Sequence, residues 1–135
     1  MKAISDKKLT RAAIYSLSFL WIFTGLTSLF FKPGIGYEIL ANAGITDTLA
    51  NIAVVGGGAL DIALGVWLLT SFKTKLCFTV QLSVIATYTL LLTIIDASFW
   101  LHPFGPLTKN IPIVVLILFL INQTETKKNK RKMLT

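Results

Sequence analysis

Long stretches without a charged residue limit the folds that this chain can adopt. From Ala12 to Phe31, 20 consecutive residues carry no charge. Because a helix rises about 1.5 Å per residue, this run can cross the roughly 30 Å hydrocarbon core of a bilayer. A second run from Ala50 to Ser71 contains a single charge, Asp61, and a third from Leu76 to Ile95 contains none. With 54% hydrophobic and only 14% charged residues, the composition is that of an all-α integral membrane protein.

The distribution of basic residues predicts a fourth, shorter span before the C-terminus. Only 15 residues separate Lys109 from Glu125, but basic clusters flank the first span and this last one. Cytoplasmic segments carry the excess of lysine and arginine, and four spans place both clusters on that side. We therefore expect a single membrane domain, a four-helix bundle with both termini in the cytoplasm. Its spans are predicted at about 12–31, 50–71, 76–97 and 109–124.

The segments between the spans are expected to be short and simple. Residues 32–49 form an outer loop in which Tyr37 to Ala43, followed by Gly44, predicts a short interfacial helix with a glycine cap. Asn110 is expected to cap the last helix, with Pro112 in its first turn. Residues 125–135 form a basic, solvated cytoplasmic tail.

Charge and cysteine content exclude several classes of function. The net charge of +7 is divided among short clusters between apolar runs, which does not make the wettable basic face of a nucleic-acid binder. Cys77 is the only cysteine, so an intrachain disulfide and a cysteine-based metal cluster are excluded. No catalytic triad, metal-ligand spacing or phosphate loop is present. We predict no catalytic residue and no metal site.

Asp61 is the most informative candidate for a functional residue. A carboxyl group near the middle of a bilayer is costly unless it is protonated, paired or wetted. Gly58 and Gly65 share its helix face, which predicts that this face meets other helices. Counting depth from the predicted cytoplasmic ends places Trp21, Thr24 and Tyr88 at its level, with Tyr88 and Thr24 as the expected hydrogen-bond partners. Two interpretations stay open: a proton-linked or ligand-binding carboxyl, and a protonated carboxyl that holds two helices together.

Other polar side chains form two further groups of candidates. Gln81 and Tyr88 are seven residues apart and share a face of the third span, where interhelical hydrogen bonding is the simpler interpretation. The predicted outer segments carry a polar mouth that could bind an anion, a quinone-type head group or a periplasmic partner. Alternatively, its lysines reach toward lipid phosphates, and Glu38 forms an ion pair with one of these lysines. The candidates in this mouth are Lys32, Tyr37, Glu38, Trp100, His102 and Lys109, and Asn110, next to Lys109, is a further candidate.

The outer loop HPFGPLTKN, residues 102–110, resembles the PFGPLxKN signature of the DoxX-like family of small four-helix membrane proteins. Further similarities are TGL at 24–26 with Lys32, GYEIL at 36–40, the Trp-Leu-Leu at 67–69 and Gln81. One departure is His102, where an acidic residue is expected before the Pro-Phe pair.

The resemblance implies a bacterial inner-membrane protein associated with thiosulfate–quinone oxidoreduction or oxidative-stress complexes. It therefore implies an envelope oxidoreductase as partner. No cofactor is evident from the residues themselves, and a quinone is implied by the resemblance alone. Two hypotheses follow: a non-catalytic subunit or anchor of such a complex, and a small proton-linked transporter or lipid- or quinone-handling protein that uses Asp61. The sequence leaves the substrate open, and also whether copies of the chain associate.

Overall fold

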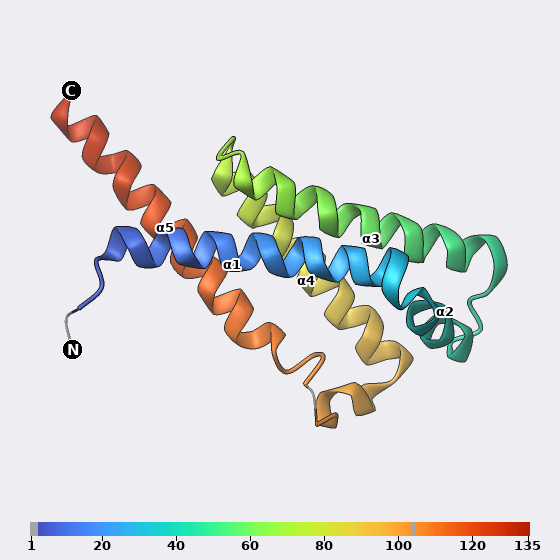
Figure 1. Cartoon of the computed structure of the whole chain (residues 1–135). Helices are drawn as coiled ribbons and strands as arrows, with labels where there is room; N and C mark the ends of the chain where they lie inside the picture. Colours follow the sequence, from blue (N-terminus) through green and yellow to red (C-terminus); the bar gives the residue numbers. More distant parts are fainter. Residues whose placement is uncertain (1–2, 104) are drawn as a thin grey trace. The chain divides into compact units, whose positions relative to one another are not determined.

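The computed structural model describes residues 3–103 and 105–135, and within these ranges it contains helices and loops but no strand (Figure 1). A π-helical turn, η1 (Thr27–Phe31), continues the first helix, and a 3-10 turn, η2 (Ala97–Leu101), follows the fourth. The α-helices are α1 (Asp6–Leu26), α2 (Pro33–Asn42), α3 (Asp47–Leu69), α4 (Thr74–Ile95) and α5 (Asn110–Leu134). The chain divides into two compact units, a first unit Met1–Phe72 and a second unit Lys73–Thr135. Each unit is described by itself.

Three helical segments are long and apolar enough to cross a membrane: Asp6–Phe31, Asp47–Leu69 and Thr74–Ile95. They contain the first and third apolar runs completely and the second as far as Leu69, two residues short of Ser71. The first begins earlier than its apolar run because the Ser5 side chain accepts a hydrogen bond from the Lys8 backbone N–H, 3.4 Å away, and so caps α1.

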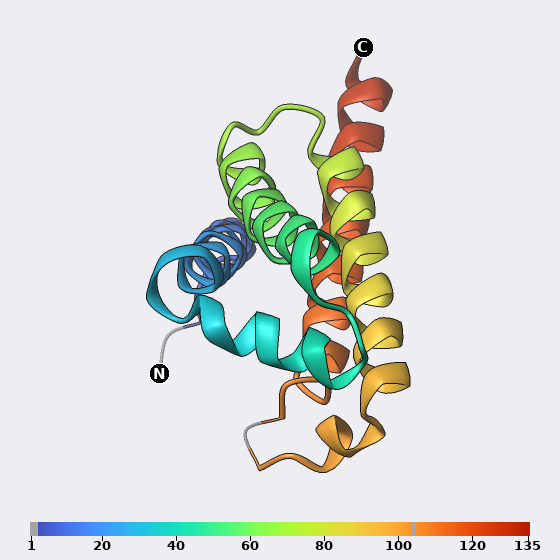
Figure 2. The same cartoon turned by 90° about the vertical axis from the view of Figure 1, so that its right-hand side faces the viewer.

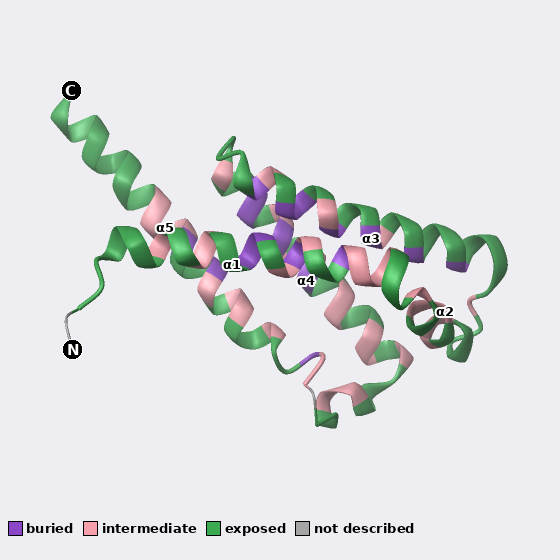
Figure 3. Ribbon diagram, viewed as in Figure 1, coloured by how far each residue is buried: buried purple, intermediate pink, exposed green. Residues whose placement is uncertain are grey.

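In the first unit, α1 and α3 lie side by side because small residues let their backbones approach (Figure 2). A Cβ atom on Gly25 would lie 2.5 Å from the Gly58 carbonyl oxygen, and one on Gly65 would lie 2.8 Å from the Ser18 carbonyl oxygen. Neither position has room for a larger residue. Without a hydrophobic driving force in lipid, such close backbone packing is a main source of helix association. Residues buried along α3 recur every three or four positions on one side of the helix (Figure 3).

The short helix α2 begins at Pro33, four residues before the predicted start at Tyr37. Proline is favoured at the first helical position because its missing N–H has no intrahelical partner there. The helix ends at Asn42, and Gly44 follows with φ +78°, a conformation that suits glycine. A hydrogen bond of 2.8 Å from the Tyr37 hydroxyl to Asn51 Oδ1 connects α2 to α3.

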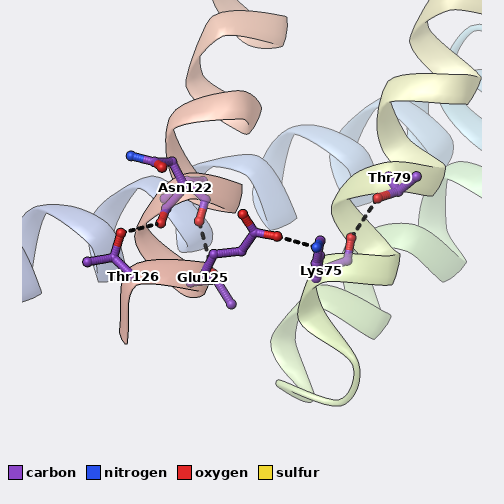
Figure 4. Close-up of polar contacts among 7 residues, drawn as sticks. Lys75, Thr79, Asn122, Glu125 and Thr126 are labelled. Atoms are coloured by element: carbon purple, nitrogen blue, oxygen red, sulfur yellow. Dashed lines mark hydrogen bonds and ion pairs between the residues drawn. The ribbon is translucent and has the colours of Figure 1, made fainter. Parts of the chain in front are cut away.

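In the second unit, α4 and α5 pack against each other as an antiparallel pair. Lys75 and Glu125 form an ion pair at the end of α4 where that helix begins (Figure 4). At the other end Asn110 Nδ2 donates a hydrogen bond of 2.9 Å to Thr89 Oγ1. The Lys75–Glu125 ion pair and the Asn110–Thr89 hydrogen bond lie about 21 Å apart along α4 and about 22 Å apart along α5. The two helices therefore stay aligned over this length.

The α5 helix differs from the sequence-based prediction at both ends. Asn110 does not cap it: Asn110 is the first helical residue, Lys109 occupies the cap position without a side-chain bond, and the Asn110 amide is engaged by Thr89. Pro112 lies in the first turn, as predicted. At the other end the expected tail, 125–135, is a helical continuation as far as Leu134. Its second half is polar, so α5 is not among the three helices apolar enough to span a membrane.

Candidate functional site

Asp61 is buried in the first unit, with 4% of its surface exposed. It shares a face of α3 with Gly58 and Gly65, whose backbones lie against α1. Trp21 on α1 is also buried. Thr24 lies on the exposed side of α1, so the prediction that it pairs with Asp61 is wrong. The other expected partner, Tyr88, belongs to the second unit.

A buried hydroxyl in the same unit was not predicted as a candidate. Ser18 is 2% exposed, and its Oγ has no hydrogen-bond partner within the described part of the chain. Its backbone carbonyl lies against Gly65, one helical turn from Asp61. The α1–α3 interface therefore holds two buried polar side chains in otherwise apolar surroundings. Serine is common in apolar runs, so its presence at position 18 did not indicate a buried polar side chain.

Gln81 in the second unit is fully buried on α4. Its Nε2 donates a hydrogen bond of 3.3 Å to Cys77 Sγ, four residues earlier on the same helix. This bond is intrahelical, and the interhelical hydrogen bond expected of Gln81 stays a prediction. Tyr88, two turns further along, is half-buried.

The segment that joins α4 to α5 is held by side-chain hydrogen bonds. Trp100 Nε1 donates to Thr93 Oγ1 at 2.9 Å, and Thr108 Oγ1 donates to the Trp100 carbonyl oxygen at 3.0 Å. Leu107 in the same segment is fully buried. Hydrogen bonds from the Ser98 hydroxyl and from the Ser98 backbone N–H hold the pKa of the Asp96 carboxyl below its usual range. We refer to residues 97–109, except Phe104, as the joining loop.

The residues of the predicted mouth are divided between the two units. Trp100, His102, Lys109 and Asn110 lie on or beside the joining loop of the second unit, where His102 and Lys109 are exposed. The remaining three, Lys32, Tyr37 and Glu38, lie at α2 in the first unit. Glu38 is exposed and forms no ion pair within residues 3–103 and 105–135, so the expected pairing with a lysine is wrong.

A groove of about 590 Å³ runs between α4 and α5. Its walls are apolar side chains of both helices, and Trp100 and Leu107 of the joining loop close one end. Thr89 and Asn110 are the polar side chains that line it, and they lie at that same end. No pattern in the sequence indicates this groove, because its width depends on how two helices pack.

No group of three or more His, Cys, Asp or Glu side chains that could hold a metal ion occurs among the described residues. The joining loop exposes both polar and apolar side chains, and the groove is an apolar channel with Thr89 and Asn110 at one end.

A family model matches residues 18–118 of this chain, from α1 into α5, and it describes the DoxX-like family. The chain belongs to the DoxX-like family. The match includes the joining loop with its HPFGPLTKN sequence and both buried glycine contacts of α1 and α3. Neither a curated protein nor a solved structure matches the chain. Family membership and three apolar helices of sufficient length identify this DoxX-like chain as a membrane protein.

Proposed function

We propose that this DoxX-like protein is a non-catalytic subunit or anchor of a redox or envelope-stress complex in the cytoplasmic (inner) membrane. In this proposal α5 is the fourth span of a four-helix bundle, both termini are cytoplasmic, and the joining loop faces outward. The clustering of lysine and arginine near the two termini supports this orientation. The observation that carries the proposal is the joining loop, which is both ordered by side-chain bonds and rich in exposed groups.

The joining loop has the properties of a docking surface. Leu101 is 89% exposed, and His102 and Lys109 are exposed on the same loop. The bonds from Trp100 to Thr93 and from Thr108 to Trp100 hold the loop backbone before any partner binds. A preorganised surface loses less conformational entropy on association, so it binds more tightly for the same contacts. An envelope oxidoreductase is the partner we propose, with a quinone as the electron carrier of the complex.

Affinity purification from native membranes in mild detergent tests this role. We expect an oxidoreductase to be recovered with the wild-type chain and lost with Leu101→Asp. Leu134→Asp is the matched control, because Leu134 is equally exposed at the far end of α5. Deletion of the protein should also raise oxidant sensitivity. Recovery of the protein alone, with unchanged oxidant sensitivity on deletion, would contradict the proposal.

A second candidate function is proton-linked transport or the handling of a lipid or quinone, and the burial of Asp61 supports it. Asp61→Asn keeps the shape of the side chain and removes its ability to exchange a proton. If Asp61 couples protons to a solute, this variant should fold and lose proton-coupled flux in liposomes. Asp47→Asn, in the exposed first turn of α3, is the control that should keep flux. Full activity of Asp61→Asn would exclude this role.

A further inference from the structure

The groove between α4 and α5 is open to the surroundings of the second unit. Leu90 and Val115 at its rim are 64% and 60% exposed, and Ile111 is 57% exposed. In a membrane protein such a surface meets lipid. Its volume of about 590 Å³ lies within the range of small-molecule sites.

Thr89 differs in its hydrogen bonding from four other serine and threonine residues of α4. A hydroxyl on a membrane helix usually donates to the carbonyl oxygen four residues earlier. Thr89 accepts from Asn110 instead, and its own O–H has no acceptor in the described ranges. This hydroxyl lines the groove, so an acceptor atom supplied by a ligand would satisfy it. The four that follow the usual pattern are Thr79, Ser83, Thr87 and Thr93, at 2.6–3.1 Å.

The same end of the groove favours a negatively charged group. Lys109 directly precedes Asn110, and Asn110 has a second N–H beyond the one donated to Thr89. The positive end of the α5 helix dipole points in the same direction. Asp96, the acidic residue of this end, already accepts a hydrogen bond from Ser98.

We propose that this groove binds a long-chain fatty acid. The carboxylate accepts hydrogen bonds from the Thr89 hydroxyl and the Asn110 amide, close to Lys109. The alkyl chain follows the apolar walls toward Leu82 and Leu118. From Asn110 to Leu118 the helix rises about 12 Å, so the groove holds the first part of the chain and the remainder continues into the bilayer. The charge and the hydrogen-bond donors at one end, with only apolar walls beyond, match a single-chain carboxylate.

Photo-cross-linking with a diazirine analogue of palmitate tests the proposal on the full-length protein in lipid nanodiscs. Labelled peptides are identified by mass spectrometry, and unlabelled palmitate is the competitor. We expect labelling in α4 and α5, lost on competition. Thr89→Val removes the donor while keeping the shape of the side chain. The concentration of unlabelled palmitate that halves the labelling should rise about tenfold, as expected for the loss of a hydrogen bond to a charged group. Thr87→Val is the matched control, because that hydroxyl is exposed and bonded to Ser83.

A second variant tests occupancy of the groove. Ala86→Phe places a large ring among the lining residues and should abolish labelling. Ala53→Phe, at an exposed alanine of α3, should leave labelling unchanged. Circular dichroism establishes that each variant is folded, and if Ala86→Phe is not, the comparison of Thr89→Val with Thr87→Val decides. The proposal is overturned if unlabelled palmitate competes equally well against labelling of Thr89→Val and of Thr87→Val. It is also overturned if methyl palmitate, a phospholipid or a prenyl quinone competes as well as palmitate.

Discussion

Replacing Gly25 by alanine is expected to separate α1 from α3. The new Cβ would lie 2.5 Å from the Gly58 carbonyl oxygen and 2.6 Å from Ile62 Cγ1, so the helices must move apart. Overpacking of this kind costs about 1–3 kcal/mol, and the Gly58 backbone oxygen has no alternative rotamer that could relieve it. In lipid the lost contacts are not replaced by a hydrophobic driving force. Unfolding in a titration with denaturing detergent should therefore occur at a clearly lower detergent fraction than for the wild type.

Gly56→Ala is the control for this prediction. Gly56 lies on α3, two residues before Gly58, and a Cβ there would meet no atom within 4 Å. Since alanine is the better helix former by about 0.5–1 kcal/mol, this variant should unfold at the wild-type detergent fraction or a higher one. If both variants unfold at the same point, close packing at Gly25 does not hold α1 and α3 together.

Replacing Trp100 by alanine is expected to release the joining loop. The variant loses the Nε1–Thr93 hydrogen bond and the ring that closes one end of the groove. A local loss of about 1.5–3 kcal/mol would raise the population of the open loop about 10- to 100-fold. Trypsin cleavage after Lys109, followed by mass spectrometry of the fragments, should accelerate by a similar factor.

Trp100→Phe distinguishes the contribution of the aromatic ring from that of the Nε1 hydrogen bond. It retains an aromatic ring and loses only the bond to Thr93, so cleavage after Lys109 should accelerate about fivefold for a loss of about 1 kcal/mol. Equal cleavage rates for the wild type and Trp100→Ala would show that the loop is not held by this side chain. The surface proposed for docking would then not be preorganised.

Sequence reasoning located the long helices because their signal is local. Uncharged runs of bilayer length need no knowledge of tertiary contacts, and Pro112 fits a first helical turn wherever that helix packs. The boundaries of α2 were harder to predict from the sequence. The rule that proline favours the first helical position places its start at Pro33, four residues before the predicted start at Tyr37.

The side-chain partners could not be predicted from spacing alone. Asn110 has the residue type of a helix cap, and only the position of Thr89 on another helix shows that its amide is used elsewhere. Thr24 has about the right depth for Asp61 but the wrong helical face. The groove depends on the separation of α4 and α5, which no single-helix pattern contains. In each case the missing information was the rotation or separation of a helix relative to its neighbour.

The most direct test of the proposed architecture is the side of the membrane on which three positions lie. Single cysteines are introduced as Ala3→Cys, Ser98→Cys and Thr135→Cys in a Cys77→Ala background and treated with a membrane-impermeant maleimide. Intact cells with a permeabilised outer membrane should label only Ser98→Cys, and the two terminal positions should react only after the inner membrane is opened. Labelling of positions 3 and 135 from opposite sides would mean an odd number of spans, and it would contradict the four-span membrane subunit.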